Sequence, residues 1–357
     1  MTHIPFYVGS YTQIEGHVPR GRGKGIYAYL LNNETGELVR ASITTGMTNP
    51  TYILFDEKAG LVYAVEEKVG TQGHLRLYSV NFDGSLMEIS RQPTLGFASC
   101  HISRCGSDHV VVANYASGNA ASFATGGGKL EPGVCVSYTG SGPVTERQEG
   151  SHAHHSVTSP DGKWIFVCDL GSDKIWCHAA TMPLSQPRHS TSTPPGSGPR
   201  HLVFHPVHPM VYVICELAGF LLVCNYDAEH GNLSITSAIS CLPPNYEGTP
   251  SSACIRMHPS GEAVYLSNRG HDSIAIFAIN TTDGSLKNKT GNPEWFPCGG
   301  AEPRDFAIDP TGRWLVVGNQ NGNTLAVFNI ISPCHVDYGR VRKYSCDTPA
   351  CIAFSQG

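Results

Sequence analysis

The sequence has few charged residues, no long apolar run and no closely paired cysteines. Charged residues make up 15 % of the 357 residues and hydrophobic residues 40 %, which is the balance of a folded chain rather than a disordered one. No apolar stretch approaches the roughly 20 residues that a membrane-spanning helix requires. We therefore expect a folded protein with no membrane partner.

The chain also lacks a basic character. Its formal net charge is −5, so it has no positive surplus to meet the phosphates of nucleic acid. We therefore expect no nucleic-acid partner. A small anionic substrate could still bind, but only where cations gather locally.

Cysteines are numerous but not arranged for disulfides or zinc. There are 13, an odd number, and no two are spaced as CxxC. Cys168, Cys215 and Cys224 lie inside apolar segments, as small buried hydrophobes do in a reducing compartment. The first residues, MTHIPFYVGSYT, do not resemble a secretory leader. These features predict a cytoplasmic protein without a cysteine-based metal site.

No segment shows convincing helical periodicity, and a repeat of strand-like segments takes its place. The stretch SPDGKWIFVCDLGSDKI (159–175) recurs as HPSGEAVYLSNRGHDSIAIFAI (258–279) and as DPTGRWLVVGNQNGNTLAVFNI (309–330). Each copy has an apolar strand, a Pro-X-Gly turn, and a second strand that ends in a polar residue. The period of about 50 residues, with four strands in each copy, is typical of a β-propeller blade.

Seven copies predict an all-β, seven-bladed β-propeller with four antiparallel strands per blade. The chain starts at a second-strand motif and ends at a first-strand motif, so the N- and C-terminal strands should share one blade and close the ring. We expect a single domain over residues 1–357. Its blades are predicted at 348–357 plus 4–47, 49–95, 97–138, 152–195, 199–240, 249–296 and 302–345.

Antiparallel first and second strands bring two sets of residues to one mouth of the channel. The predicted ends of the second strands are Ser10, Glu66, Asn114, Asp169, Glu216, Asn268 and Asn319. The predicted starts of the first strands are Thr51, Ser99, His154, Arg200, Ala253, Arg304 and Ala350. Polar residues at strand ends often only satisfy turns, and an arginine beside Glu216 could form a structural ion pair. Clustered arginines in an acidic protein instead favour an anion clamp.

Three histidines fall within four positions in GSHAHH (150–155). On a regular strand, His152 and His154 would share one face and His155 would take the other. His154 falls in the predicted mouth, so we expect it to act as a general base, with His152 as the substitute. Two imidazoles at this spacing could also chelate zinc, which leaves a metal site as an alternative.

Several motifs together resemble the seven-bladed lactonase family, which includes bacterial-type 6-phosphogluconolactonases and fungal carboxy-cis,cis-muconate cyclising enzymes. They are HAHHSVTSPDGKWIFVCDLGSDKI (152–175), GPRHLVFHP (198–206), VYLSNRGHDSIAIFAI (264–279), EPRDFAIDPTGRWLVVGNQ (302–320) and the opening YVGSYT (7–12). The likeness covers essentially the whole chain. It implies a catalytic set of His154, Arg200, Glu216 and Arg269, with no cofactor. We further expect Arg304, His152, Asn319, Asn268 and Asp169 to bind substrate.

The resemblance implies hydrolysis of 6-phospho-D-glucono-1,5-lactone to 6-phosphogluconate, a step of the pentose phosphate pathway. His154 would activate water, Arg200 would polarise the carbonyl, and Glu216 would orient Arg200 or the histidine. The expected partner is a small anionic sugar lactone, bound by a monomer or weak homodimer. Two alternatives stay open: a muconate-type lactone cycloisomerase and a non-catalytic protein-binding propeller. Metal-dependent lactonase propellers use carboxylate and Asn ligands, which Glu66, Asn114, Asp169 and Asn268 could imitate.

Overall fold

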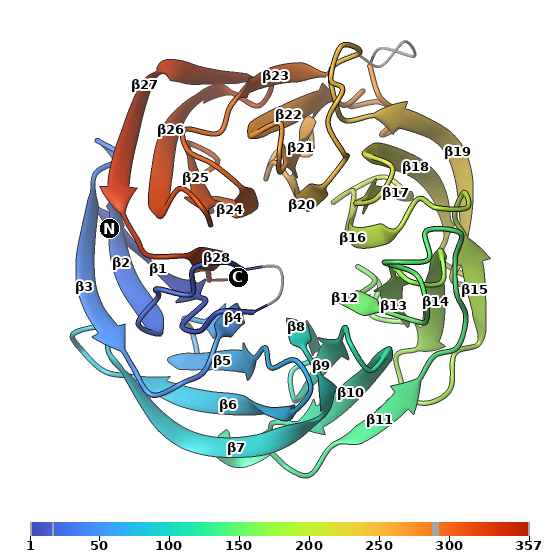
Figure 1. The fold of residues 1–357 in the computed structure, drawn as a ribbon, viewed down its shortest axis with the longest axis horizontal. Coiled ribbons are helices and arrows are strands. Elements are labelled where there is room, and N and C mark those ends of the chain that lie inside the picture. Colours follow the sequence, from blue (N-terminus) through green and yellow to red (C-terminus); the bar gives the residue numbers. More distant parts are fainter. Residues whose placement is uncertain (1, 16–17, 288–292, 356–357) are drawn as a thin grey trace.

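Seven four-stranded antiparallel sheets surround a central channel in the computed structural model, which describes residues 2–15, 18–287 and 293–355 (Figure 1). The predicted all-β, seven-bladed propeller is therefore confirmed. Parts of the blades predicted at 4–47, 249–296 and 348–357 lie outside the described residues.

From the channel outward, the blades contain the following strands. The first holds β28 (Pro349–Phe354), β1 (His3–Ser10), β2 (Ile26–Asn32) and β3 (Leu38–Thr44); the second holds β4 (Pro50–Asp56), β5 (Leu61–Glu66), β6 (Gln72–Val80) and β7 (Leu86–Phe97); the third holds β8 (Ser99–Cys105), β9 (His109–Asn114), β10 (Asn119–Ala124) and β11 (Val134–Ser137); the fourth holds β12 (Ala153–Thr158), β13 (Trp164–Asp169), β14 (Lys174–Ala179) and β15 (His189–Ser192). The fifth holds β16 (Pro199–Phe204), β17 (Met210–Cys215), β18 (Phe220–Asp227) and β19 (Asn232–Ser240); the sixth holds β20 (Ser252–Met257), β21 (Ala263–Asn268), β22 (Ser273–Ala278) and β23 (Glu294–Pro297); the seventh holds β24 (Pro303–Ile308), β25 (Trp314–Asn319), β26 (Thr324–Ser332) and β27 (His335–Ser345).

The Pro-X-Gly turns join the first and second strands on the face away from the predicted site. In each of three copies the glycine has a left-handed backbone, with φ of +70° at Gly162, +76° at Gly261 and +75° at Gly312. Side chains with a Cβ rarely adopt this conformation, so glycine is required to close the turn. The repeated turn thereby fixes where each second strand begins.

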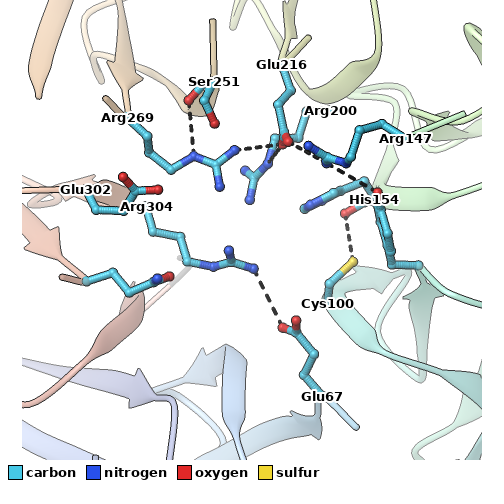
Figure 2. Close-up of a pocket in the computed structure, with 12 residues that line it drawn as sticks. Glu67, Cys100, Arg147, His154, Arg200, Glu216, Ser251, Arg269, Glu302 and Arg304 are labelled. Atoms are coloured by element: carbon cyan, nitrogen blue, oxygen red, sulfur yellow. Dashed lines mark hydrogen bonds and ion pairs between the residues drawn. The ribbon is translucent and has the colours of Figure 1, made fainter. Parts of the chain in front are cut away.

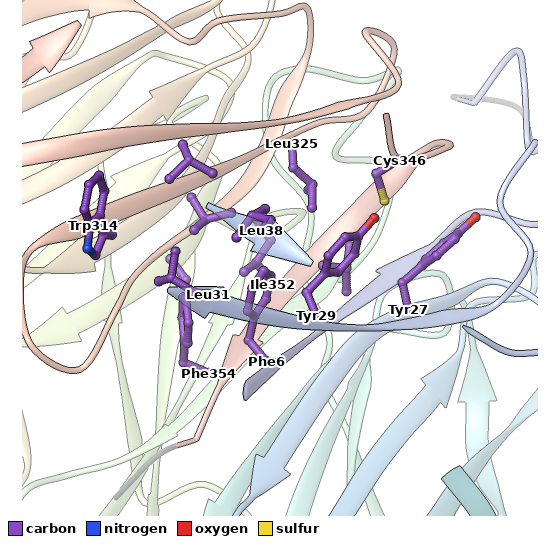
Figure 3. Packing of buried hydrophobic residues seen from close by; sticks show 14 residues of the cluster. Phe6, Tyr27, Tyr29, Leu31, Leu38, Trp314, Leu325, Cys346, Ile352 and Phe354 are labelled. Atoms are coloured by element: carbon purple, nitrogen blue, oxygen red, sulfur yellow. The ribbon is translucent and has the colours of Figure 1, made fainter. Parts of the chain in front are cut away.

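The two ends of the chain close the ring in one blade (Figure 1). Strand β28 pairs antiparallel with β1, placing Phe354 opposite Phe6 and Ile352 opposite Val8. These side chains join a buried cluster that also contains Trp314 from the neighbouring seventh blade (Figure 3). Closure is therefore secured by strand pairing within one blade and by apolar packing against the next.

A β-bulge interrupts every innermost strand near the channel mouth. Between β12 and β13, for example, the pairing moves from Ala153 to His155 and leaves His154 without an opposite residue. The other six blades show the same kind of shift, and it leaves Arg200 unpaired in β16 and Arg304 in β24. A bulge bends the strand and redirects the side chain of its extra residue. Each blade can therefore turn one additional side chain toward the mouth.

None of the helices formed by the described residues is long and apolar enough to cross a membrane.

Candidate active site

A polar cavity of about 350 Å³ occupies the mouth of the channel, at the end where the innermost strands begin (Figure 2). It is lined by Glu67, Cys100, Tyr115, Arg147, His154, Arg200, Glu216, Ser251, Arg269, Glu302, Arg304 and Gln320. Four arginines and three glutamates are therefore gathered in one small space.

Two positions of the repeated blade supply most of this lining. The bulged residue of the innermost strand contributes Cys100, His154, Arg200 and Arg304. The residue directly after the second strand contributes Glu67, Tyr115, Glu216, Arg269 and Gln320. The site is thus made by one small feature of each blade, repeated around the ring.

The predicted alignment of the strand ends is wrong by one residue at two places. The second strand of the fifth blade ends at Cys215, which pairs with Pro199 as Glu66 pairs with Pro50. Glu216 is consequently equivalent to Glu67 rather than to Glu66. In the third blade Ser99 holds the paired position, so the cavity residue is the next one, Cys100.

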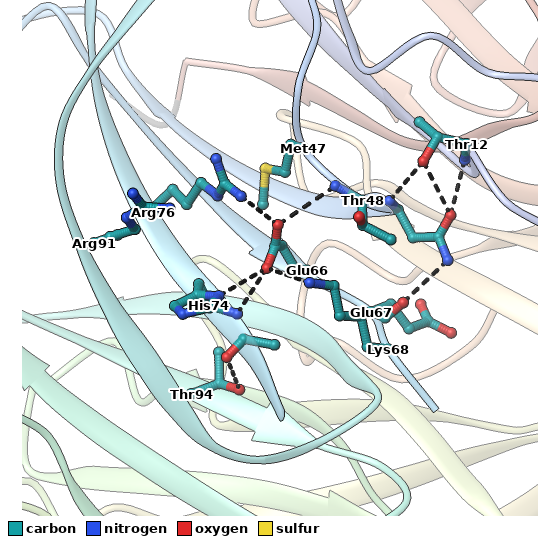
Figure 4. Close-up of polar contacts among 12 residues, drawn as sticks. Thr12, Met47, Thr48, Glu66, Glu67, Lys68, His74, Arg76, Arg91 and Thr94 are labelled. Atoms are coloured by element: carbon teal, nitrogen blue, oxygen red, sulfur yellow. Dashed lines mark hydrogen bonds and ion pairs between the residues drawn. The ribbon is translucent and has the colours of Figure 1, made fainter. Parts of the chain in front are cut away.

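Glu66 turns away from the channel and into its own blade (Figure 4). Its carboxylate lies 2.6 Å from Arg76 Nη2, 3.0 Å from His74 Nδ1 and 3.1 Å from Lys68 Nζ. These partners hold the pKa of Glu66 below its ordinary value, although burial acts in the opposite direction. Glu66 is therefore a structural residue, and its neighbour Glu67 is the one that faces the cavity.

Asp169, Asn268 and Asn319, which were predicted to bind substrate, are fully buried within their blades. Asp169 accepts hydrogen bonds from Trp176 Nε1 and from the backbone of His152 at 3.0 Å and 2.7 Å. The amides of Asn268 and Asn319 donate to backbone carbonyls of adjacent turns at 2.9 Å and 3.2 Å. None of these three residues lines the cavity, and their hydrogen bonds hold strand ends together behind its wall.

The bulge separates the three clustered histidines differently from the regular strand that was predicted. His152 stacks on the ring of Tyr115 at 4.3 Å between centroids, and its Nε2 lies 3.1 Å from Glu149, so it supports the cavity wall from behind. His154 points into the cavity (Figure 2). Its Nδ1 is buried with no hydrogen-bond partner among the described residues, which leaves Nε2 to meet a substrate.

His155 was expected on the opposite face, yet it also faces the channel because of the bulge. Below the cavity its ring packs against His201 and His101, with centroids 4.7 Å and 4.1 Å away. His201 in turn contacts His154 at 5.3 Å, and His101 contacts Tyr52 at 4.2 Å. All four imidazoles are at most 6 % exposed, so they form a buried cluster of rings, of which His154 lines the cavity.

Glu216 is the centre of the cavity's charge network. Its Oε2 lies 2.9 Å from Arg200 Nε and 2.9 Å from Arg269 Nη2, and its Oε1 lies 2.7 Å from Arg147 Nη2. Burial would raise the pKa of this carboxyl, but the three guanidiniums hold it well below its ordinary value. Glu216 is therefore ionised, and it fixes three cations around one point.

Arg200 is held on several sides at once. Besides Glu216, its Nη1 donates to the carbonyl of Ala253 and to His201 Nε2, the latter at 3.2 Å. Burial, with the nearby Arg269 and Arg304, lowers the pKa of Arg200 to about 10, against the opposing effect of Glu216. The guanidinium is thus charged at neutral pH, poorly solvated and fixed in orientation, as suits a group that stabilises developing negative charge.

Arg304 extends into the cavity from the side opposite His154 (Figure 2). Its guanidinium lies 5.1 Å above the ring of Tyr11, and its Nη2 is 3.7 Å from Glu67 Oε2. The phenolic hydroxyl of Tyr11 donates to Glu67 Oε1 at 2.9 Å, so these three side chains form one supported unit. Arg304 is therefore positioned but only loosely paired, and it can accept an anionic or hydroxyl-bearing ligand.

His154 is neutral in this environment. Burial and the charge of Arg200 hold the pKa of its imidazole well below 6.5, although Glu216 acts in the opposite direction. A neutral imidazole beside fixed guanidiniums can take a proton from water while the cations meet the oxyanion that forms. The arrangement is therefore suited to opening an ester or lactone.

No group of three or more histidine, cysteine or carboxylate side chains is arranged to hold a metal ion within the described ranges. Glu66, Asn114 and Asp169, considered above as possible oxygen ligands, each bind protein groups within their own blades.

The alignment of the repeat missed several cavity residues, chiefly Arg147, Tyr115 and Glu67. Tyr115 and Glu67 follow their second strands directly, so a register shifted by one residue would have found them. Arg147 lies in the connection between β11 and β12, where no repeat aligns it with other blades. The only signal was its place in TERQEG (145–150), a charged stretch just before the histidines.

Comparisons with known proteins agree with this architecture. A family model described as lactonase, 7-bladed beta-propeller, matches residues 5–354. The 6-phosphogluconolactonase of Bacillus subtilis (strain 168) is 32 % identical over 332 residues, covering 92 % of this chain and 91 % of that protein. The 6-phosphogluconolactonase of Formosa agariphila is 31 % identical and covers 94 % of each chain. The structure of the periplasmic gluconolactonase of Pseudomonas aeruginosa superposes with a TM-score of 0.88 at 28 % identity, covering 99 % of both chains.

Proposed function

The chain belongs to the seven-bladed lactonase β-propeller family, and from this we propose that it hydrolyses 6-phospho-D-glucono-1,5-lactone to 6-phosphogluconate. Lactone hydrolysis is the activity that the family and its named relatives share. The observation that carries the proposal on this chain is the placement of His154 beside Arg200, which Glu216 fixes within the cavity. This makes the protein a carboxylic ester hydrolase.

In the proposed reaction His154 Nε2 removes a proton from water as the water attacks the lactone carbonyl carbon. The carbonyl π electrons move to the oxygen, and Arg200 stabilises the resulting oxyanion. When the tetrahedral intermediate collapses, the ring C–O bond breaks and the leaving alkoxide takes the proton back from the imidazolium. Glu216 acts by holding Arg200 and does not itself exchange a proton, because its pKa lies well below neutral pH.

Arg269 and Arg304 are assigned to the anionic part of the substrate. Arg269 is fixed by Glu216 and by its Nε, which donates to the Ser251 carbonyl at 3.1 Å. Arg304, from the neighbouring seventh blade, lies on the same side of the cavity (Figure 2). Guanidinium presents a fork of donors that matches phosphate and carboxylate oxygens.

The cellular setting forms part of the same proposal. All 13 cysteines are free, which suits a cytoplasmic enzyme of the pentose phosphate pathway. A monomer or weak homodimer belongs to the same proposal, because the side chains of a single chain already supply the base, the oxyanion-stabilising arginine and the anion-binding arginines.

The experiment that tests the function is a hydrolysis assay on the purified chain. 6-Phosphogluconolactone, generated in situ, is compared with unphosphorylated gluconolactone, and spontaneous opening is subtracted. A parallel arm with EDTA tests for metal dependence. Turnover above background, indifferent to EDTA and lost in His154→Ala, is the expected result. If neither lactone is turned over, muconate-type lactones are tested next, and failure there would point to a binding propeller.

A further inference from the structure

We propose that Arg147 joins Arg269 and Arg304 in binding the phosphate group of the substrate and thereby sets the preference for phosphorylated over unphosphorylated lactones. This inference rests on the proposed function, since it names how one substrate class is selected. It is carried by the position, exposure and spare hydrogen-bonding capacity of a guanidinium that lies outside the repeated blade pattern.

Arg147 reaches the cavity from the long connection between β11 (Val134–Ser137) and β12 (Ala153–Thr158). The neighbouring Gln148 is fully buried and anchors this connection, because its Nε2 donates to the Leu170 carbonyl and to Asp173, both at 2.8 Å. With Gln148 fixed in the wall, Arg147 is directed over the mouth, and its Nη2 lies 2.7 Å from Glu216 Oε1. The connection is thus anchored to the propeller at Gln148, and this anchor fixes the position of Arg147.

Exposure separates Arg147 from the other cavity arginines. Its side chain is 44 % exposed, compared with 3 % for Arg200, 10 % for Arg269 and 9 % for Arg304. A lactone must place its carbonyl beside the buried pair of His154 and Arg200. The phosphate, at the far end of the sugar and costly to desolvate, would then lie nearer the solvent, where Arg147 is the cation that meets it.

The charge around Glu216 also favours an incoming anion. Arg147, Arg200 and Arg269 all bind this single carboxylate, so the group carries three positive charges against one negative charge. The resulting surplus of two matches the charge of a phosphomonoester dianion. Glu216 cannot neutralise it by itself, and the other two glutamates of the cavity, Glu67 and Glu302, lie toward Arg304 and away from Arg147 (Figure 2).

Arg147 retains donors for a ligand. Its Nη2 serves both Glu216 and the hydroxyl of Tyr115, the latter at 3.3 Å. Its Nη1 and Nε make no hydrogen bond to any residue that the structure describes, so these two nitrogens keep N–H groups that can donate to oxygen atoms of a ligand. A phosphate held there would accept hydrogen bonds from these unused donors. The fold has already positioned the cation that carries them.

The kinetic test compares Arg147→Gln with the wild type on 6-phosphogluconolactone and on gluconolactone. A hydrogen bond to a charged group contributes about 1.5–3 kcal/mol, so kcat/KM for the phosphorylated lactone should fall about 10- to 100-fold, mostly through KM. The ratio of kcat/KM for the phosphorylated lactone to kcat/KM for gluconolactone should therefore fall by about tenfold or more. Arg91→Gln is the matched control, because Arg91 is an exposed arginine paired with Glu88 on an outer strand. Equal losses on both lactones, or no loss on either, would overturn the proposal.

A binding measurement separates this inference from the proposed function. The product 6-phosphogluconate is titrated into wild type and Arg147→Gln by calorimetry, with gluconate as the comparison. Weakening by about tenfold or more for the phosphorylated acid alone supports phosphate recognition by Arg147, even if the wild type hydrolyses neither lactone. Unchanged affinity for 6-phosphogluconate overturns the inference, even if the wild type proves to be an active lactonase.

Discussion

Arg200 Nε and Glu216 Oε2 lie 2.9 Å apart, and both side chains are at most 4 % exposed. Such a pair is sustained by its mutual charge and by further hydrogen bonds, because both partners are largely removed from water. Glu216 also holds Arg147 and Arg269. Its removal would release three guanidiniums at once.

We therefore predict that Glu216→Gln loses both stability and activity. Leaving buried cations unpaired should lower the free energy of unfolding by about 3–5 kcal/mol, as measured by chemical denaturation. Hydrolysis should fall by about 10²-fold or more, because Arg200 loses its orientation. Glu294→Gln is the control, since Glu294 is 44 % exposed and lies 3.9 Å from His335. A stable variant with normal kcat would remove Glu216 from the proposed role.

The pH dependence of hydrolysis tests the protonation state of His154. Burial and Arg200 lower the pKa of this imidazole, so the neutral form that acts as a base persists below pH 6.5. As pH falls from 8, kcat/KM should stay level through 6.5 and decline only at more acid values. His154→Asn should lose about 10²- to 10⁴-fold at every pH. An acid limb centred near 6.5 to 7 would show that the base is another group or is better solvated.

His201 is predicted to be a positioning residue for Arg200. Its Nε2 accepts a hydrogen bond from Arg200 Nη1, and burial with the charge of Arg200 holds the pKa of His201 well below its ordinary value, so the acceptor persists at neutral pH. His201→Leu should lower kcat by about tenfold or more with little change in KM, because a hydrogen bond to a charged group is lost.

Two further variants distinguish positioning from general damage to the channel. His201→Gln retains an acceptor near the same place and should recover most of kcat. His155→Leu is the matched control, because His155 is buried in the same cluster of imidazoles and contacts the ring of His201 at 4.7 Å. If His155→Leu lowers kcat as much as His201→Leu, the effect comes from the packing of this cluster and not from Arg200.

Ring closure predicts a large cost for shortening a side chain on the last strand. Ile352 is 3 % exposed and packs in the cluster shared by the first and seventh blades (Figure 3). Ile352→Ala should lower the free energy of unfolding by about 2–5 kcal/mol in denaturant titrations. The same change at Ile331, which is 60 % exposed, should cost little. Comparable losses at both positions would contradict the role given to β28.

The propeller fold could be predicted from the sequence because the same strand-and-turn motif recurs along the chain. Each Pro-X-Gly turn, such as the one closed by Gly162, marks the same junction between a first and a second strand. A split repeat at the two ends of the chain also predicted that β28 would pair with β1, and the register confirms it. Errors in any one copy are corrected by the other copies.

The residues of the candidate site were harder to predict from the sequence. Which side chains enter the cavity depends on the placement of single residues within each strand. A β-bulge carries no strong sequence signal, and it is the bulge that brings both His154 and His155 to the channel. A shift of one residue likewise exchanged Glu66, which binds Arg76, for Glu67, which faces the cavity. Arg147 has no counterpart in the repeat, so only the folded connection could reveal it.

The four arginines of the cavity have a consequence for the release of product. Opening the ring creates a carboxylate among four arginines, so the departing acid is held by the same charges that drew in its precursor. We therefore expect accumulated product to compete with substrate for the cavity. Turnover would then depend on how quickly the product is removed.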